Sequence, residues 1–283
     1  MLPAFDPKYA SPASDSNGSN RNQRTFVHDD RVRIRQIREE KGEAKMKLKL
    51  TGLFLLVFAA TCSAQTTTGT TPQNPPAPPS YKAGGTPIVI PSPTTDMVEV
   101  GDEARGVMEV AVPDSNRLIA AYLLPQDLPL LTKGSESPEL TKYALVEVPR
   151  NGEYSDVEAS DFKEIMDGAS QEIGAILSSS FSETEDEFNR RLKDLNVNAT
   201  VSLGKPVQLG ALFAKTDAFG FGLITQVTVG TSSSNMAMAA AIIRVRKRVI
   251  FAYLYAEYKN DDTVKWLRKS SEDWADAILK ANQ

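Results

Sequence analysis

The sequence predicts an α+β protein with a mainly antiparallel sheet, a helical middle segment and a C-terminal helix packed on the sheet. Strand-like runs stand before and after a stretch with helical spacing, and they do not alternate with helices one by one. The runs 238–246 and 248–256 are joined by a tight polar connection, as in a hairpin. The last stretch, 262–283, carries an apolar stripe of helical period.

The first strands precede the helical stretch. Residues 106–112 alternate as a strand does, the turn residues 113–116 follow, and 117–124 continue as a second strand, which together indicate a hairpin. A further short strand is predicted at 143–148.

Two helices are predicted in the middle of the chain. The second should begin at the capping box Ser182-x-x-Glu185, so the acidic residues 183–187 are interpreted as helix-start chemistry. The first is indicated by apolar residues at i, i+3, i+4 and i+7 spacings: Phe162, Ile165, Met166, Ala169, Ile173, Ile176 and Leu177.

Five strands are expected after these helices, at 199–203, 207–215, 221–229, 238–246 and 248–256. The last has two apolar faces, so we expect it at the centre of the sheet, covered on both sides. Its aromatic face holds Phe251, Tyr253 and Tyr255, and its aliphatic face holds Ile250, Ala252 and Leu254. The closing helix has Asp262 as its expected N-cap and the stripe Val264, Leu267, Ser271, Trp274, Ile278 and Ala281.

Residues 46–64 have the three parts of a secretory signal peptide. Lys47 and Lys49 form a positive n-region, an apolar stretch follows, and small residues end at Ala64, so cleavage is expected between Ala64 and Gln65. A transmembrane anchor is the alternative, but the apolar run is shorter than the roughly 20 residues that cross a bilayer. An exported protein, periplasmic or extracellular and of the bacterial envelope, is therefore expected.

The signal divides the chain into segments. Residues 1–45 are polar and expected to be disordered, and because a positive n-region normally opens a protein, Met46 is the expected translation start and 1–45 an upstream extension. Residues 65–95 are rich in Thr, Pro and Gly and are predicted to be an extended linker. Residues 96–283 are long enough for one α+β domain.

Cys62 offers a second export route, acylation as a membrane-tethered lipoprotein. The preceding Ala59-Ala60-Thr61 fits this route poorly, because a Leu is expected where Ala59 stands and Thr61 is bulky. Membrane association is thus expected only if Cys62 is acylated or the signal stays uncleaved. Cleavage after Ala64 removes the only cysteine of the chain.

The only histidine, His28, also precedes the signal, so the exported product would contain neither Cys nor His. That composition excludes Ser-His-Asp and Cys-His catalysis, Cys/His zinc sites and thiol redox chemistry. No catalytic, cofactor-binding or metal-binding residue is predicted. The part from residue 65 onward has 21 Lys and Arg against 29 Asp and Glu, which argues against nucleic acid as a partner.

Three other patterns in the sequence have a functional and a purely structural interpretation. Ser160-x-x-Lys163 has the spacing of penicillin-recognising enzymes, but its companion motifs are wrong, and a helix start with a solvated lysine is the better interpretation. The acidic runs 261–262 and 272–276 have no diagnostic spacing for hydrolysis or calcium. The aromatic residues Tyr253, Tyr255, Tyr258, Trp266 and Trp274 are expected in the core, although a tyrosine beside a cleft could stack on a sugar.

One basic cluster is expected at a hairpin tip and is our candidate partner-binding patch: Arg244, Arg246, Lys247 and Arg248. A partner's acidic surface could dock there. Charges at such a turn also serve simply to keep a strand edge soluble.

The ending 249–278 is a tyrosine-bearing strand, an acidic turn and a Trp-containing helix, and it resembles exported PsbP-like α/β/α domains. The resemblance implies an antiparallel sheet flanked by helices, in a family that mostly binds or assists other proteins. It carries over no functional residue.

Two functions follow as hypotheses. The favoured one is a non-catalytic envelope protein that binds another envelope protein or a small ligand. The alternative is a carboxylate- or Lys-dependent hydrolase of cell-wall or extracellular polymers, suggested by the acidic clusters and the export signal.

Overall fold

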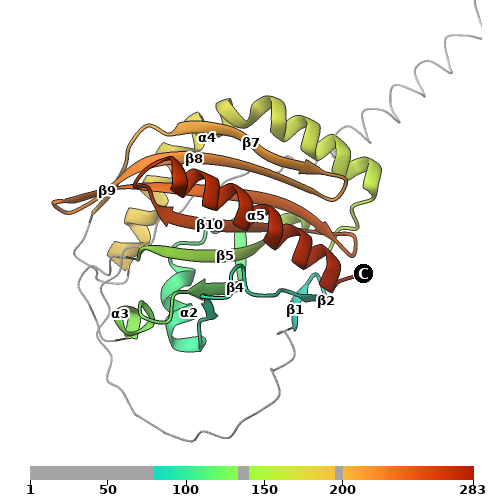
Figure 1. Ribbon diagram of the computed structural model, residues 1–283, viewed down its shortest axis with the longest axis horizontal. Helices are drawn as coiled ribbons and strands as arrows, with labels where there is room; N and C mark the ends of the chain where they lie inside the picture. The colour runs from blue at the N-terminus through green and yellow to red at the C-terminus, as the bar shows by residue number, and fades with distance from the viewer. Residues whose placement is uncertain (1–79, 133–139, 195–199) are drawn as a thin grey trace, which may run out of the picture. The chain divides into compact units, whose positions relative to one another are not determined.

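The computed structural model describes residues 80–132, 140–194 and 200–283 (Figure 1). The predicted extension 1–45, signal peptide 46–64, cleavage point Ala64–Gln65 and acylation candidate Cys62 lie outside these residues. The α+β class is confirmed, because an eight-stranded antiparallel sheet dominates the described part. Its strands are β3 (Val98–Glu99), β4 (Asn116–Leu123), β5 (Lys142–Pro149), β6 (Val201–Leu203), β7 (Val207–Lys215), β8 (Ala218–Val229), β9 (Ser232–Val245) and β10 (Arg248–Glu257).

The strand order is β3-β4-β5-β10-β9-β8-β6, with β7 also paired to β8, so β10 lies in the middle as predicted. The expected alternation along β10 is confirmed as well. Phe251, Tyr253 and Tyr255 enter one buried cluster, and the aliphatic residues between them enter another on the opposite face. On the aromatic face, Tyr255 stacks on Tyr143 of β5 with ring centroids 4.3 Å apart.

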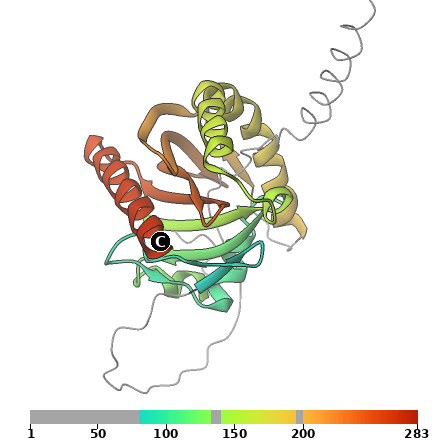
Figure 2. The ribbon, with the colours of Figure 1, turned by 90° about the vertical axis from the view of Figure 1, so that its right-hand side faces the viewer.

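Two long helices cover the two faces of the sheet (Figures 1 and 2). α4 (Ala159–Asp194) packs on the aromatic face through Phe162 and Phe188, whereas α5 (Asp261–Ala281) packs on the aliphatic face through Leu267 and Trp274. Each helix therefore completes one of the two cores.

The prediction of two middle helices is wrong, because α4 is continuous from residue 159 to 194. No proline interrupts this stretch, and a capping box marks a helix start only where the preceding residues leave the helix. The side chains of 172–183, among them Ile173, Ile176, Leu177 and Ser182, lie outside the described part.

The strand predicted at 106–112 is also wrong: α2 (Asp102–Glu109) occupies this region, and a turn follows it. The buried residues Ala104, Met108 and Ala111 are spaced by four and three, which is a helical period. Arg105 fixes the helix by donating to the carbonyl oxygens of Leu118 and Ile119, both at 3.0 Å. Those carbonyls lie at a register shift between β4 and β5.

The predicted linker 65–95 ends earlier than expected, because residues 80–95 belong to the folded unit. β1 (Ser80–Ala83) and β2 (Thr86–Val89) form a hairpin, and Ile88 and Ile90 are fully buried. The proline-rich composition suggested a linker, but the alternating apolar residues of this segment pack against α5 and β4. The remaining short elements are α3 (Leu128–Thr132) and the 3₁₀ turn η1 (Arg150–Gly152).

α5 begins two residues earlier than the sequence predicts. The N-cap is Asn260, whose side-chain oxygen accepts from the backbone N–H of Asp262 at 2.9 Å, and Asp262 lies inside the first turn. Within the described residues, the helices lack a stretch that is both long and apolar enough to cross a bilayer.

Candidate functional site

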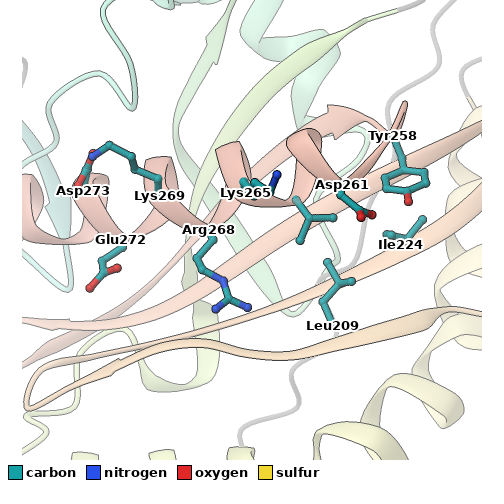
Figure 3. Close-up of a pocket in the computed structure, with 10 residues that line it drawn as sticks. Leu209, Ile224, Tyr258, Asp261, Lys265, Arg268, Lys269, Glu272 and Asp273 are labelled. Atoms are coloured by element: carbon teal, nitrogen blue, oxygen red, sulfur yellow. The ribbon is translucent and has the colours of Figure 1, made fainter.

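A groove of about 560 Å³ runs between α5 and the strands β7 and β8, and we call it the α5 groove. This volume lies in the range of roughly 300–1,000 Å³ that small-ligand sites occupy. Figure 3 shows residues of the helix facing residues of the two strands across it. Its lining comprises Leu209, Ile224, Tyr258, Asp261, Val264, Lys265, Arg268, Lys269, Glu272 and Asp273.

The floor of the groove is apolar. Leu209 of β7 and Ile224 of β8 are partly buried and pack against the aliphatic core, as does Tyr258, which directly follows β10. Gly222 of β8 lets Leu209 lie close to the strand, because a Cβ there would stand 3.2 Å from Leu209 Cδ1. A ligand in the groove would therefore contact apolar side chains that are fixed by packing against the core.

The wall formed by α5 is charged, and most of its charges are neutralised within the protein. Lys265 lies 2.8 Å from Asp262, and Lys269 lies 2.7 Å from Asp273. The hydrogen bond to Asp273 raises the pKa of Lys269, so this ammonium stays charged at neutral pH. These pairs leave little free charge on the outer side of the helix.

Lys215, the last residue of β7, ties the strand to the helix. Its ammonium lies 2.8 Å from Asp276 and 3.0 Å from Glu272, and the hydrogen bond to Asp276 raises the pKa of Lys215. Glu272 is thereby drawn toward β7. Lys215 thus holds a carboxylate that lines the α5 groove.

Arg268 is the cation that the groove leaves free. Its guanidinium makes no hydrogen bond or ion pair with any described residue, although Glu272 stands four residues further along the helix. Figure 3 shows Arg268 extending from α5 on the side of the strands. A guanidinium over an apolar floor is suited to bind a carboxylate or phosphate group with two parallel hydrogen bonds.

The outer edge of β7 is a poor template for another strand. Gly210 has φ +73°, and the β7–β8 register shifts at Gly210 and again between Ala211 and Phe213. Such bulges twist an edge away from regular pairing. Recognition at this place would therefore depend on the side chains of the α5 groove.

The predicted basic patch is assembled at the β9–β10 turn, but its members bind the protein itself. Arg244 pairs with Asp217 at 2.6 Å, and Lys247 pairs with Glu158 at 2.6 Å. Arg246 donates to the carbonyl oxygens of Asn282 and Pro87, and Arg248 lies 3.0 Å from Asp156. Docking of a partner there stays a prediction, and these contacts favour the α5 groove as the candidate site.

The residues that could support hydrolysis or metal binding do not come together in one site. Lys163 is exposed and pairs with Asp167 at 2.6 Å, rather than with the Ser160 hydroxyl. The acidic runs of α5 lie along the helix surface, where Glu272 and Asp273 are paired with lysines. Within residues 80–132, 140–194 and 200–283, we find no cluster of acidic side chains suited to hold a metal ion.

One carboxyl stands apart because it is fully buried. Burial raises the pKa of Glu147 to about 8, and its neighbours Asn116 and Arg191 act in the opposite direction. The side chain lies on the aromatic face of the sheet, enclosed beneath α4. It is out of reach of a polymer substrate, so it gives the hydrolase hypothesis no support.

Sequence reasoning missed Arg268, Leu209 and Ile224. An Arg followed by Glu at i+4 ordinarily suggests a helix-surface pair, so Arg268 gave no sign of being free. Of the aromatic residues expected in the core, Tyr253, Tyr255 and Trp274 are buried. Tyr258 and Trp266 are only partly buried, and Tyr258 lines the α5 groove.

Comparisons with known proteins find only distant similarity. Neither a protein-family model nor a curated protein matches the sequence. Among solved structures, the chain is similar to the Ran-binding protein Mog1p of Saccharomyces cerevisiae, with 13% identity, a TM-score of 0.28, and coverage of 70% of this chain and 89% of that one. It is also similar to the cyanobacterial PsbP of Synechocystis, with 14% identity, a TM-score of 0.30, and coverage of 75% and 96%. The second of these structures is a PsbP protein, of the family that the ending 249–278 resembles in sequence.

Proposed function

We propose that this domain is a non-catalytic binding module that holds a short segment of a partner protein, an apolar side chain beside a carboxylate, in the α5 groove. The observation that carries the proposal is Arg268, a cation without an internal partner above the apolar residues Leu209 and Ile224. Such a pairing of a free cation with an apolar floor fixes both the position and the orientation of a ligand.

The proposal includes export. The signal pattern of residues 46–64 supports a protein that works in the envelope or outside the cell, with the partner in the same compartment. The N-terminal mass of the protein from its host tests this part. A mature start at Gln65 supports cleavage, an acylated Cys62 makes the module a tethered lipoprotein, and retention of residues 46–64 overturns the cleavage.

Photo-crosslinking in the producing cell tests the groove. A photoreactive side chain replaces Leu209 in the full chain, and the same group replaces the exposed, distant Lys163 as a matched control. We expect an adduct of defined mass from position 209 and none of that mass from position 163. Equal labelling from both positions would contradict the groove as the binding site.

A second experiment tests whether Arg268 binds the carboxylate of the partner segment. Arg268→Gln should reduce the yield of the position-209 adduct, because a charge-assisted hydrogen bond contributes about 1.5–3 kcal/mol, or roughly ten- to hundredfold in affinity. Lys163→Gln serves as control and should leave the yield unchanged. An undiminished adduct in Arg268→Gln would remove the carboxylate from the proposal.

A further inference from the structure

A second concave site lies at the β1–β2 hairpin and shares no lining residue with the α5 groove. We call it the hairpin pocket; it has a volume of about 500 Å³ and is lined by Lys82, Gly85, Arg117, Arg150, Glu153 and Tyr154. The β1–β2 hairpin, the start of β4 and the turn η1 each contribute to it.

The walls of the hairpin pocket are fixed by internal contacts. Arg117 is ion-paired with Glu153 and donates to the carbonyl oxygen of Lys82 at 2.8 Å. The Gly84 N–H donates to Glu153 at 3.1 Å, so the same carboxylate holds the hairpin turn. Glu153 is the only acidic residue of the lining, and Arg117 neutralises it.

Two cations remain for a ligand. The Lys82 ammonium makes no hydrogen bond or ion pair within the part of the chain that the structure describes. Arg150 donates from Nε to the carbonyl oxygen of Asn116 at 2.8 Å, which orients its guanidinium, and no described acidic side chain pairs with it. Both residues are exposed. The lining of the pocket therefore carries three cations against one carboxylate, and of the two cations without an ion pair only Arg150 is oriented by an internal contact.

Tyr154 adds a flat apolar surface beside these charges. Its side chain is 77% exposed, the largest exposure among the big apolar and aromatic residues of the described part. An aromatic ring left in water next to two cations offers stacking to a ring and attraction to an anion in one place.

We propose that the hairpin pocket binds a small organic anion in which a phosphate or carboxylate group is attached to an aromatic ring. The anionic group lies between Lys82 and Arg150, and the ring stacks on Tyr154. The ion pair of Arg117 with Glu153 joins two of the residues that line the pocket.

Calorimetric titration of the full chain tests the pocket with four defined probes: phenyl phosphate, benzoate, inorganic phosphate and benzyl alcohol. Phenyl phosphate should bind about three- to tenfold more tightly than inorganic phosphate, because the ring adds stacking on Tyr154. Benzyl alcohol should not bind, since it lacks the charge. A benzoate affinity above that of phenyl phosphate assigns the site to carboxylates, and the reverse order assigns it to phosphates.

The variants separate charge from stacking. Lys82→Gln should weaken phenyl phosphate about tenfold, and Tyr154→Ser should abolish its advantage over inorganic phosphate while leaving the latter's affinity unchanged. Lys163→Gln, which removes an exposed helix lysine elsewhere, is the matched control. Equal affinity of all variants for phenyl phosphate, or no heat with any anion, overturns the proposal. Unfolding temperatures within a degree of one another show that the variants are folded.

Discussion

Asn116 donates its side-chain N–H to the Oε2 atom of Glu147 at 2.8 Å, and both residues are buried on the sheet beneath α4. The other carboxyl oxygen of Glu147 is buried without a hydrogen-bond partner. A carboxylate with one partner in an apolar core is costly, so the acid is favoured in its neutral form. Glu147 therefore couples the stability of the fold to pH.

The first prediction concerns this coupling. The pKa of Glu147 is about 8 in the folded protein and near 4.5 when exposed, so the folded state holds one more proton between these values. Stability should thus fall as pH rises through this window, by about 1.4 kcal/mol per pH unit. Asp114 and Glu153 have lowered pKa values, so the stability that they contribute is lost only at acidic pH, below this window. Urea unfolding at pH 5, 6.5 and 8 measures the slope.

Glu147→Gln is the control for that slope. The amide keeps the acceptor for Asn116 and cannot ionise, so the variant should lose the decline between pH 5 and 8 and exceed the wild type in stability at pH 8. Parallel stability curves for the two proteins would show that Glu147 does not titrate in this range.

The second prediction concerns Asn282, whose side-chain amide forms two hydrogen bonds with the backbone of β2. Its side chain accepts from the Val89 N–H at 2.8 Å and donates to the Val89 carbonyl oxygen at 2.7 Å, so it pairs with β2 as a backbone would. Asn282→Asp removes the donor and sets a carboxylate against a carbonyl. We expect a loss of about 1–3 kcal/mol, because a buried acceptor is left unpaired.

Hydrogen exchange distinguishes local from global effects of Asn282→Asp. The Val89 amide and its neighbours in the β1–β2 hairpin should exchange faster, while amides of β9 and β10 keep their protection. Uniform acceleration throughout the sheet would instead show that Asn282 supports the whole domain.

The central part of the fold could be predicted because its patterns are long and local. The faces of β10 follow from alternation over Ile250–Tyr255, and the α5 stripe follows from residues such as Leu267, Trp274 and Ile278. The β9–β10 turn was predicted at Arg246 and Lys247, which indeed take φ values of +47° and +64°.

Short patterns failed where a distant contact decides the structure. In α2, the seven residues 106–112 suit either period, and the helix is fixed by Arg105 bonding to carbonyls of β4. The α5 groove was missed for a similar reason. In an isolated helix, Glu272 would form an ion pair with Arg268. In the folded protein, Glu272 pairs with Lys215 of β7 instead, and the local sequence of α5 does not reveal this distant partner.

The third prediction compares two neighbouring glycines in the β1–β2 turn. A Cβ at Gly84 would stand 1.9 Å from the Glu153 carbonyl oxygen, whereas a Cβ at Gly85 meets nothing within 4 Å. Both have positive φ, +54° and +79°, so both alanine variants carry the backbone cost of about 1 kcal/mol. Gly84→Ala should cost clearly more, since the hairpin must also move off the backbone at Glu153.

Urea unfolding of the two glycine variants gives the answer, with Gly85→Ala as the internal control. Equal losses of stability would mean that the hairpin shifts without cost. Phenyl phosphate binding in the hairpin pocket should fall in Gly84→Ala, because the displaced hairpin carries Lys82 away from Arg150.

The fourth prediction concerns the segment that joins the hairpin to the sheet. Tyr122 of β4 donates its hydroxyl to the Ile90 carbonyl oxygen at 3.0 Å, and Trp274 of α5 donates its indole N–H to the Pro91 carbonyl oxygen at 2.8 Å. Their rings also meet edge to face, with centroids 6.0 Å apart. Two elements thus hold adjacent carbonyls of one segment.

Tyr122→Phe should cost about 1–2 kcal/mol, because it leaves a buried carbonyl unpaired, and Trp274→Phe should cost more, since it also leaves unfilled volume in the core. The double variant is the decisive measurement. Once one bond is lost, the segment is already loosened, so the second loss should cost less than it does alone, with an interaction energy of about 0.5–1 kcal/mol. Strict additivity in urea unfolding would show that residues 90 and 91 are anchored independently, and the segment would then be held by the burial of Ile88 and Ile90 rather than by these two bonds.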